Sequence, residues 1–524
     1  METEEEENKR SIEERKKKVF AYSEADLKEL PYRRASAATF IFIVLVFGIP
    51  LWWRTTSTYR VSFANFPEDQ HIFIPVYLKI ACINCSLKGK LNDVSSNLVE
   101  ALEDLPRIEK LILEYKTELF FVDSEQQLSE LVTDDGKFSI YVAVVEEASW
   151  NFSDAVVYFS SKSWAFIKNH SDKELLLQRM LSSVADVLLD VGHLSTIIRR
   201  DLKKRMGPLE FAALPINHQK RLVWDSAALS AKYIVHIIFI DLDGWSLERN
   251  QELKDAVLNV RRFATRVSAV INVEVSTENL WDFSLSPWLI TDNEEKSFIK
   301  VSDVSKIITK VDQQTSTVES SAPLLKLVVF KSKKKISLVD HTGSENGALA
   351  VASWGCVTFT GGKMTVSQSL IGALRVLLGL DTELPYSTGR YPSPIADWEL
   401  SRLRLRSFVD SSMNAISSVR AIHNLVAQIS NVVINDEVAG CANKAVKLIV
   451  NALKTAKETG RIDVATTIEG RALADKAVND HSLLALLYFP NDQKFAVYLP
   501  LFLPTLLPIF GSIVAFYKHW REKD

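Results

Sequence analysis

Cysteine is scarce in this chain, which has only four cysteines among its 524 residues. Such a long chain with so few cysteines is not a disulfide scaffold of the kind that small secreted domains use. Cys82 and Cys85 follow a strand-like run, where either a local disulfide or two free thiols would fit. A zinc site would need two more ligands, and the sequence has neither a second CxxC nor an HxxxH pair. No metal site is predicted, and Cys356 and Cys441 are expected within apolar elements.

An excess of either charge is also lacking. The 62 Lys and Arg residues against 65 Asp and Glu residues leave a net charge of −3, and the pI is about 6.4. This balance gives no electrostatic case for binding nucleic acid. The basic cluster at 331–335 could touch anionic lipid or an acidic partner, but a solvated loop or strand end is the commoner explanation.

Catalytic motifs are lacking as well. There is no GxSxG elbow, and the segment Gly343–Gly347 beside His341 predicts a hairpin turn instead. The segment Asp241–Gly244 predicts a turn at a strand end, since one carboxylate pair without further ligands is weak support for a metal. His236 lies in an apolar strand, where a hydrogen-bonded core histidine is expected. No catalytic residue, cofactor-binding residue or metal ligand is therefore predicted.

Two long runs without acidic or basic residues stand near the two ends of the chain. Ala35–Trp53 has 19 residues and ends in a tryptophan pair, where an interfacial aromatic belt would fall. Phe495–Phe516 has 22 residues, which as a helix would extend about 33 Å, enough to cross a bilayer. A cleaved signal peptide is the competing interpretation of the first run. Its 34 preceding residues and the bulky Trp52 and Arg54 at its end disfavour cleavage. Two transmembrane helices are therefore predicted.

Three prolines recur every four residues in the second run, at Pro500, Pro504 and Pro508. On a helix they share one face, and each leaves a carbonyl one turn upstream without its donor. In hydrocarbon those carbonyls need another protein surface, a hydroxyl such as that of Thr505, or a local rearrangement. The three prolines are candidates for packing this helix against other membrane helices.

Lys and Arg residues beside the two runs predict the orientation of the chain. Seven lie in the twenty residues before Ala35, and three follow Phe516 within eight residues. By the positive-inside rule both termini are cytosolic, and the roughly 440 residues between the runs lie across the membrane. The N-glycosylation candidates Asn84, Asn151 and Asn169 all fall between the runs, in agreement with a luminal setting.

The residues between the two runs show two periodicities. Runs rich in β-branched and aromatic residues predict strands at 72–80, 138–145, 155–159, 233–240, 270–275, 324–330 and 354–359. Helical spacing predicts helices at 174–189, 253–268 and 366–380. Pro75 lies inside the first strand and favours an edge position for it. The mixture predicts a luminal α/β domain, with a mixed sheet covered by helices.

A turn-rich connector at 385–394 is the best internal boundary. Beyond it, three stretches with helical spacing predict a small antiparallel bundle that leads to the second run. The predicted fold class is a membrane protein with two transmembrane helices, a luminal α/β domain and a helical bundle segment. The predicted boundaries are a cytosolic tail at 1–34, a transmembrane helix at 35–53, the α/β domain at 54–395, the helical segment at 396–487, a transmembrane helix at 495–516 and a cytosolic tail at 517–524.

Several segments carry a family resemblance. They are Phe47–Arg60, Trp398–Leu403, Ile429–Val438, Leu487–Pro504, and, more briefly, Trp354–Gly355 and Leu377–Leu380. These segments resemble the PIG-S family, subunits of the glycosylphosphatidylinositol (GPI) transamidase complex. The region from Phe63 to Ala350 is similar mainly in length and rhythm.

The resemblance implies a non-catalytic scaffold subunit of the endoplasmic reticulum membrane, with its bulk in the lumen. The family's complex replaces the C-terminal signal of a precursor protein with a preassembled GPI anchor. A caspase-like PIG-K subunit supplies the nucleophilic cysteine, and PIG-T, PIG-U and a Gaa-type subunit complete the assembly. None of the four cysteines here has the Gln-Ala-Cys type of context expected of that nucleophile. The implied partners are these subunits and membrane lipid, with contact to GPI or to the precursor being indirect.

Two other classes of function remain open from the residues alone. The luminal domain could be a hydrolase with dispersed catalytic residues, which a carboxylate or Cys/His cluster on one face of the sheet would reveal. It could also be a stand-alone binding module tethered by two membrane helices, which an exposed aromatic groove would reveal. The many Trp and Phe residues do not decide between these classes, because most of them belong to the core.

Overall fold

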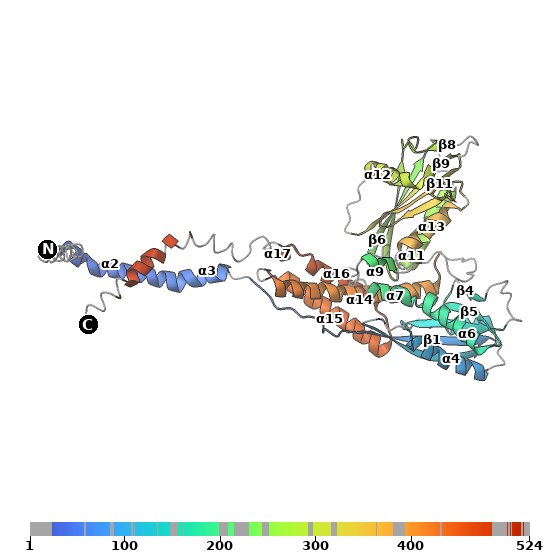
Figure 1. Cartoon of the computed structure of the whole chain (residues 1–524), viewed down its shortest axis with the longest axis horizontal. Helices are drawn as coiled ribbons and strands as arrows, with labels where there is room; N and C mark the ends of the chain where they lie inside the picture. Colours follow the sequence, from blue (N-terminus) through green and yellow to red (C-terminus); the bar gives the residue numbers. More distant parts are fainter. Residues whose placement is uncertain are drawn as a thin grey trace, which may run out of the picture. The chain divides into compact units, whose positions relative to one another are not determined.

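A computed structural model of the chain shows its helices and strands (Figure 1). The structure describes residues 24–56, 59–83, 88–105, 108, 110–133, 135–146, 156–160, 162–198, 208–213, 230–243, 251–291, 297–315, 322–362, 364–380, 394–429, 432–484, 500, 503–504, 506–514 and 517. Contacts divide the chain into two compact units. Unit 1 comprises Met1–Ser62, His423–Ala439 and Asn479–Asp524, and unit 2 comprises Phe63–Ile422 and Gly440–Val478.

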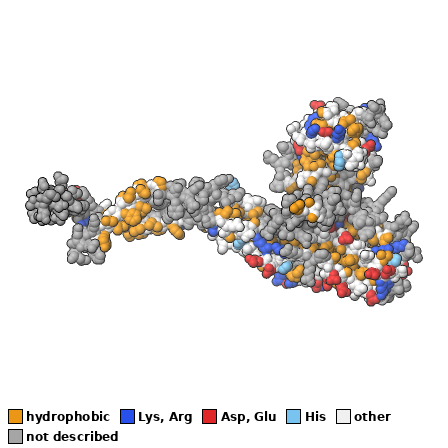
Figure 2. Space-filling model, viewed as in Figure 1, with side chains coloured by type: hydrophobic (Ala, Val, Ile, Leu, Met, Phe, Trp, Pro, Cys, Tyr) orange, Lys and Arg blue, Asp and Glu red, His pale blue; other side chains and the backbone are white. Residues whose placement is uncertain are grey.

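Unit 1 contains the first apolar run as one helical stretch. It comprises α2 (Glu24–Ile43), the π-helix η1 (Val44–Gly48) and α3 (Ile49–Thr56). The π-turn lies beside Pro50, which has no amide hydrogen to donate to the carbonyl of Val46. Residues Arg34–Leu51 have a mean hydropathy of 2.0 and none of them is buried. Hydrophobic side chains gather over these helices (Figure 2), which are long and apolar enough to cross a membrane.

The second apolar run is described in part, also in unit 1. Residues 506–514 are helical, as are Pro500 and Pro504. Leu507 and Phe510 are each 61% exposed, whereas Ile509 is only 7% exposed. One side of this helix therefore packs within unit 1 while the rest of it presents apolar side chains.

Unit 2 begins with a five-stranded sheet in the order β2-β1-β3-β5-β4. Its strands are β1 (Ile72–Ile83), β2 (Leu111–Val122), β3 (Ser139–Val145), β4 (Val157–Phe159) and β5 (Trp164–Lys168). Only β4 runs antiparallel to its neighbour. Its helices are α4 (Lys88–Glu103), α5 (Glu125–Glu130), α6 (Lys173–Ser182), the π-helix η3 (Ser183–Leu188), α7 (Val191–Ile198) and α9 (Pro208–Ala213).

A second five-stranded sheet has the order β13-β14-β10-β6-β7. Its strands are β6 (Lys232–Asp241), β7 (Asn272–Leu280), β10 (Leu324–Lys331), β13 (Ala348–Val351) and β14 (Gly355–Phe359). Helices α11 (Gln251–Val267), α12 (Val304–Gln314) and α13 (Val366–Leu377) accompany it, with a 3-10 turn, η5 (Val301–Asp303), before α12. A small third sheet contains β8 (Ile290–Thr291), β9 (Ser297–Lys300), β11 (Ile336–Val339) and β12 (Glu345–Asn346).

The two large sheets have the same connectivity, so unit 2 contains two α/β lobes of one plan. In the first lobe β1 pairs in parallel with β2 and β3, β3 pairs in parallel with β5, and the edge strand β4 is antiparallel to β5. In the second lobe β6 pairs in parallel with β7 and β10, β10 pairs in parallel with β14, and the edge strand β13 is antiparallel to β14. The registers agree as well. Tyr141 and Lys326 each pair with the first residue of the last parallel strand, Trp164 or Gly355, and on their other side they pair with Lys79 and His236, respectively. The third sheet and α12 are additions that only the second lobe carries among the described residues.

Four helices follow the lobes. They are α14 (Asp397–Gln428), α15 (Asp436–Thr459), α16 (Val464–Val478) and α17 (His481–Leu484). Residues of α14, α15 and α16 join residues of both large sheets in one continuous hydrophobic core. The helical segment thus buries its apolar side chains against the lobes as well as within itself.

The predicted mixture of sheets and helices is confirmed, but the predicted strands include neither β2 nor β5, and one strand position is wrong. Pro75 favoured an edge position for β1, but β1 lies between β2 and β3. The physical reason is the register, because pairing with β3 begins only at Tyr77, whose N–H donates to Phe138. The backbone nitrogen of Pro75, two residues before Tyr77, points toward the same neighbouring strand, but β3 has not begun at that level. The missing N–H of Pro75 therefore removes no hydrogen bond between β1 and β3.

Candidate functional site

Polar side chains recur along the interior helix α14 at intervals of three and four residues, which places them on adjoining faces of the helix. Glu399 and Asp410 are 0% and 1% exposed, and Arg402 and Arg406 are 6% and 7% exposed. Buried charges are costly unless they are paired and hydrogen-bonded. We call this row the α14 seam, and its members are Glu399, Arg402, Arg406, Asp410, Asn414 and Ser418.

The seam begins with an ion pair between two helices. Arg375 on α13 binds Glu399 with both nitrogens, Nη1 donating to Oε2 at 3.0 Å and Nη2 to Oε1. The Ala396 amide also donates to Glu399 Oε2, at 2.9 Å. Because the carboxylate lies in the first turn of α14, the positive end of that helix stabilises it too. This pair fixes α13 against the start of α14.

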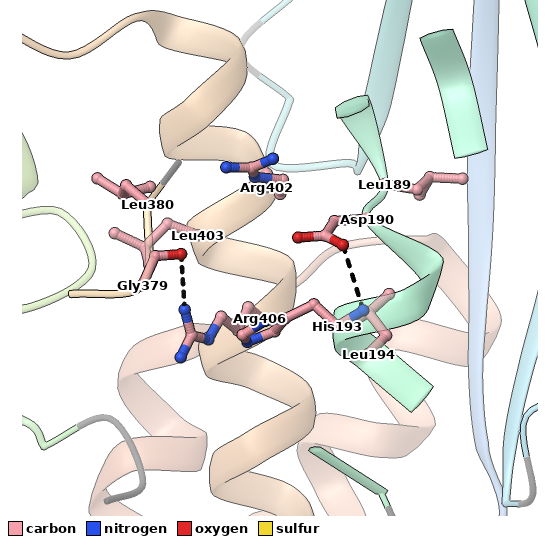
Figure 3. Close-up of a pocket in the computed structure, with 9 residues that line it drawn as sticks. All are labelled: Leu189, Asp190, His193, Leu194, Gly379, Leu380, Arg402, Leu403 and Arg406. Atoms are coloured by element: carbon pink, nitrogen blue, oxygen red, sulfur yellow. Dashed lines mark hydrogen bonds between the residues drawn. The ribbon is translucent and has the colours of Figure 1, made fainter. Parts of the chain in front are cut away.

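The next two members bind backbone carbonyls, and Figure 3 shows the bond from Arg406 to Gly379. Arg402 Nη1 donates to the Val187 carbonyl at 2.9 Å, and Arg406 Nη1 donates to the carbonyls of Leu378 and Gly379 at 3.2 and 3.1 Å. Gly379 has a φ of +71°, and a Cβ there would lie 2.0 Å from Arg406 Nη1. Glycine is therefore required at this position by both conformation and space.

A small cavity of about 10 Å³ lies between the two arginines and α7. Asp190 and His193 line its other side, and the His193 amide donates to Asp190 Oδ1 at 3.2 Å (Figure 3). Burial raises the pKa of the nearby Asp186 carboxyl, and the charge of Asp190 raises it further. The cavity has room for about one water molecule. It is too small to bind a substrate.

The start of α14 also contacts the first lobe. The Trp398 ring is 3% exposed and lies 5.3 Å from the Phe159 ring, and its Nε1 donates to the Ser160 carbonyl at 3.1 Å. Arg402 lies over the same indole, at 5.5 Å. Together with Arg375, these contacts join α14 to both lobes.

The far end of the seam contacts α16. Asp410 forms an ion pair with Arg471 at 3.5 Å, and the Ser418 hydroxyl donates a hydrogen bond to the Asp475 carboxylate at 3.1 Å. Asn414 Nδ2 donates to Asp410 Oδ1 at 3.0 Å, which satisfies a second lone pair of the carboxylate. The seam therefore positions three helices with polar contacts inside an otherwise apolar core.

A second polar cluster lies in unit 1, just after α3. The Tyr59 hydroxyl donates to the Asp436 carboxylate at 3.1 Å, and this hydrogen bond raises the pKa of Tyr59. Arg60 donates from Nη2 to the Ile429 carbonyl and from Nε to the Val432 carbonyl, both at 3.0 Å. These contacts hold the segment after α3 against the connector between α14 and α15. We call them the Tyr59–Arg60 clasp.

Backbone hydrogen bonds complete the clasp. The Ile434 amide donates to the Tyr59 carbonyl and the Val61 amide donates to the Ile434 carbonyl, both at 3.1 Å. They form an isolated parallel bridge between Arg60 and Ile434. Such a bridge is short, so the side chains of Tyr59 and Arg60 supply much of its support.

The segments that carry the family resemblance meet in these two clusters. Trp398–Leu403 supplies Glu399 and Arg402 to the seam and Trp398 to the contact with the first lobe, while Leu377–Leu380 supplies the carbonyls that bind Arg406. Phe47–Arg60 and Ile429–Val438 form the clasp together. The sequence identifies these segments, but it does not show which of them contact one another. The four-residue spacing from Arg402 to Ser418 was the available signal.

The predicted glycosylation and packing residues are described only in part. Asn169 is half-buried in the turn after β5, and its backbone N–H donates to the Val145 carbonyl at 2.8 Å. Asn84 and Asn151 lie outside the described residues. Pro500, Pro504 and Pro508 all have helical backbone and are exposed.

The cysteines differ in state. Cys82 is disulfide-bonded, whereas Cys356 and Cys441 are free; Cys85 lies outside the described residues. Cys356 is wholly buried in β14, and burial raises the pKa of its thiol to about 12. A thiol in that setting is not ionised near neutral pH, so Cys356 is a core residue and not a nucleophile.

His236 is a hydrogen-bonded core histidine, as predicted. Its Nδ1 lies 2.7 Å from Ser276 Oγ and its Nε2 lies 2.8 Å from Glu278 Oε2. Although a serine, a histidine and a carboxylate also make nucleophilic triads, this ring is 5% exposed and both its nitrogens bind residues of one neighbouring strand, β7. The geometry ties β6 to β7. Among the described residues, no cluster of three or more His, Cys, Asp or Glu side chains is placed to hold a metal.

Comparison with known proteins gives consistent matches over nearly the whole length. The profile of PIG-S, phosphatidylinositol-glycan biosynthesis class S protein, matches residues 39–523. Similar relatives are the GPI-anchor transamidase component PIGS of Bos taurus and that of Homo sapiens. Each is 24% identical to this chain, and each match covers 95% of this chain and 98% of the relative. The matched span includes residues 39–53 of the first apolar run, all of the second run, the seam and the clasp, and the chain therefore belongs to the PIG-S family.

Proposed function

We propose that this chain is a non-catalytic scaffold subunit of a GPI transamidase complex in the endoplasmic reticulum membrane. The observation that supports this most is the family match across residues 39–523, together with the names of the relatives as transamidase components. The partners implied by the resemblance are PIG-K, PIG-T, PIG-U and a Gaa-type subunit. In this proposal the chain holds those subunits together and contributes no reacting group.

The proposed arrangement has two transmembrane helices, at 35–53 and 495–516, with both termini in the cytosol. The α/β region at 54–395 and the helical segment at 396–487 lie in the lumen. The apolar, fully unburied stretch Arg34–Leu51 supports the first helix. Exposed Leu507, Phe510 and Val514 in a helical segment support the second. The sequons and the flanking positive charges support the orientation.

The interior of unit 2 supports a scaffold role. The polar groups of the α14 seam bind charged side chains of α13 and α16, each other or backbone carbonyls, and the small cavity beside the seam has room for no more than a water. The transamidase reaction needs an ionisable, accessible cysteine, and buried Cys356 is not one. In this proposal these contacts stabilise unit 2, which presents surfaces to partners.

The experiment is a purification of the tagged full chain from its own cells in a mild detergent, with mass spectrometry of what copurifies. We expect near-stoichiometric recovery of a caspase-like cysteine protease homologue and of multi-span subunits. Recovery of a monodisperse chain alone would overturn the proposal and would favour a stand-alone binding module or hydrolase.

A second measurement separates the scaffold from a catalytic role. A chain in which Cys356 and Cys441 are replaced by serine and alanine, respectively, should still restore surface display of GPI-anchored proteins in cells that lack the endogenous subunit. Selective loss of anchor attachment, with the complex still assembled, would show that the chain supplies chemistry.

A further inference from the structure

A groove of about 290 Å³ opens on the second lobe between α11 and the edge strand β7. Its floor is apolar, with Phe239 and Leu253 buried and Val257 half-buried. Lys254 and Arg261 are both exposed and stand along its α11 side. We call this the α11–β7 groove. Its volume is close to that of sites that hold several side chains of a bound peptide or a small ligand.

The first lobe shows why the second lobe has this groove. In the first lobe, β1 pairs Ile80 with Leu119 and Cys82 with Phe121 on the strand that corresponds to β7. In the second lobe, the equivalent pairs join Ile237 to Thr277 and Phe239 to Asn279. Smaller polar side chains stand where the first lobe has Leu119 and Phe121. These shorter side chains leave space beside Phe239 and Val257, and this space is the groove.

The groove adjoins a free sheet edge. The strand β7 is the last strand of its sheet, so half of its backbone N–H and C=O groups point outward, and no described strand pairs with them. An extended peptide can bind such an edge as an added strand, placing alternate side chains in the neighbouring groove. Thr277 and Asn279 belong to both features, because their side chains line the groove and their backbone forms the edge.

The positive charges that line the groove favour an acidic binding partner. Both charged side chains that line it are cations, Lys254 and Arg261, seven residues apart on α11 and so about 10 Å apart along the helix. Among the described residues, no acidic side chain lines it. The matching partner has acidic side chains on either side of an apolar one. A lipid headgroup would use the cations but not the row of backbone groups on β7, so an extended peptide fits more of the surface.

We propose that the α11–β7 groove binds an extended segment, acidic with an apolar centre, of another subunit of the complex, which adds to β7 as a further strand. This inference rests on the proposed function, since the partner is a subunit. The apolar centre would contact Phe239, and the acidic side chains would pair with Lys254 and Arg261.

The test uses the full chain in the detergent-purified complex, with a photo-reactive p-benzoylphenylalanine in place of Asn279. A matched control carries the same group in place of Arg262, which is exposed on α11 but does not line the groove. We expect the probe at Asn279 to cross-link one subunit through a segment with acidic residues, at least tenfold more than the probe at Arg262. Cross-linking to lipid only, to a segment without acidic residues, or equally from both positions would overturn the inference.

Charge reversal provides the second readout. The pair Lys254→Glu and Arg261→Glu should reduce the Asn279 cross-link at least tenfold, whereas Arg262→Glu should leave it unchanged. Reversing the acidic residues in the cross-linked segment should restore it. A thermal unfolding curve of each variant in detergent identifies any that fail to fold. Copurification of the wild-type chain with other subunits tests the proposed function separately, so an assembled complex with no cross-link from Asn279 refutes only the groove.

Discussion

At the scale of single residues, the strongest test of the α14 seam is the ion pair between Arg375 and Glu399. Replacing Glu399 by glutamine leaves a guanidinium in a buried site without its counter-charge. We expect the variant to lose about 3–5 kcal/mol of unfolding free energy. The measurement is thermal or chemical unfolding of the full chain in detergent.

An exposed pair offers the matched control for Glu399→Gln. Lys454 and Glu458 lie 3.9 Å apart on α15 and are both exposed, so Glu458→Gln should change stability by less than about 1 kcal/mol. If both substitutions had the same small effect, the buried pair would not be a determinant of stability. Replacing Arg375 and Glu399 together by methionine and leucine should recover much of the loss, because neither charge is then left unpaired.

Gly379 supplies a second test at this scale. Its φ of +71° and the 2.0 Å approach of Arg406 Nη1 to the position of a Cβ both oppose any side chain. We expect Gly379→Ala to lower the unfolding free energy by about 1–3 kcal/mol, as its backbone strain alone requires. The control is Gly372→Ala in α13, where a Cβ meets no atom within 4 Å and alanine should stabilise the helix by up to about 1 kcal/mol. Equal effects of the two substitutions would contradict the role of Gly379.

At the scale of helices and strands, the sequence predicts seven of the fourteen described strands and the long helices α11, α13, α14, α15 and α16, but not which elements pack together. The strands at 72–80, 233–240 and 324–330 are apparent from their apolar, β-branched content, because both faces of β1, β6 and β10 are covered. Which strands lie beside each other depends on contacts between residues far apart in the sequence. For this reason Pro75 predicted an edge position for β1, which is wrong. Likewise, the apolar stripe of α14 predicts a helix, but periodicity does not show that its charged residues bind carbonyls just after α13 and in η3.

The Tyr59–Arg60 clasp leads to a prediction about hydrogen exchange. Arg60→Ala removes both hydrogen bonds from the guanidinium to the carbonyls of Ile429 and Val432. Because the clasp has only a single backbone bridge, we expect the amides of Val61 and Ile434 to exchange at least tenfold faster. Mass spectrometry of the full chain in detergent measures this exchange. Tyr59→Phe, which removes only the exposed bond to Asp436, should have a smaller effect, and unchanged exchange in Arg60→Ala would contradict the clasp.

The proline row of the second apolar run is also an element-scale feature. Pro504 and Pro508 are exposed on a helical segment, and each removes a backbone donor. Replacing Pro500, Pro504 and Pro508 together by leucine should straighten the helix and weaken copurification of the membrane subunits. The control is Leu503→Val with Leu507→Val, which keeps the prolines and the apolar character. Unchanged assembly of the triple variant would remove the proposed packing role of these prolines.

At the scale of the whole molecule, unit 2 contains two lobes with one plan, which the sequence does not reveal. The lobes share strand order, strand direction and register, yet equivalent positions hold Lys79 and His236, or Leu119 and Thr277. The two lobes therefore tolerate different side chains at equivalent positions, including the buried, hydrogen-bonded Lys79 and His236. The differences at the surface distinguish the lobes, and the α11–β7 groove is one of them.

The orientation of the whole chain follows from whether Asn169 receives a glycan. Asn169 lies in the turn between β5 and α6, and the following Ser171 is exposed. If unit 2 is luminal, glycosidase H should increase the gel mobility of the membrane-bound chain. Ser171→Ala should abolish the part of that shift that is due to Asn169, while Ser171→Thr, which keeps the sequon, should retain it. Neither substitution removes the Ser171 backbone carbonyl that accepts from Lys90, so folding should be preserved. A chain without any glycan, in which protease added from the cytosolic side cleaves between the two apolar runs, would place unit 2 in the cytosol and refute the two-helix arrangement.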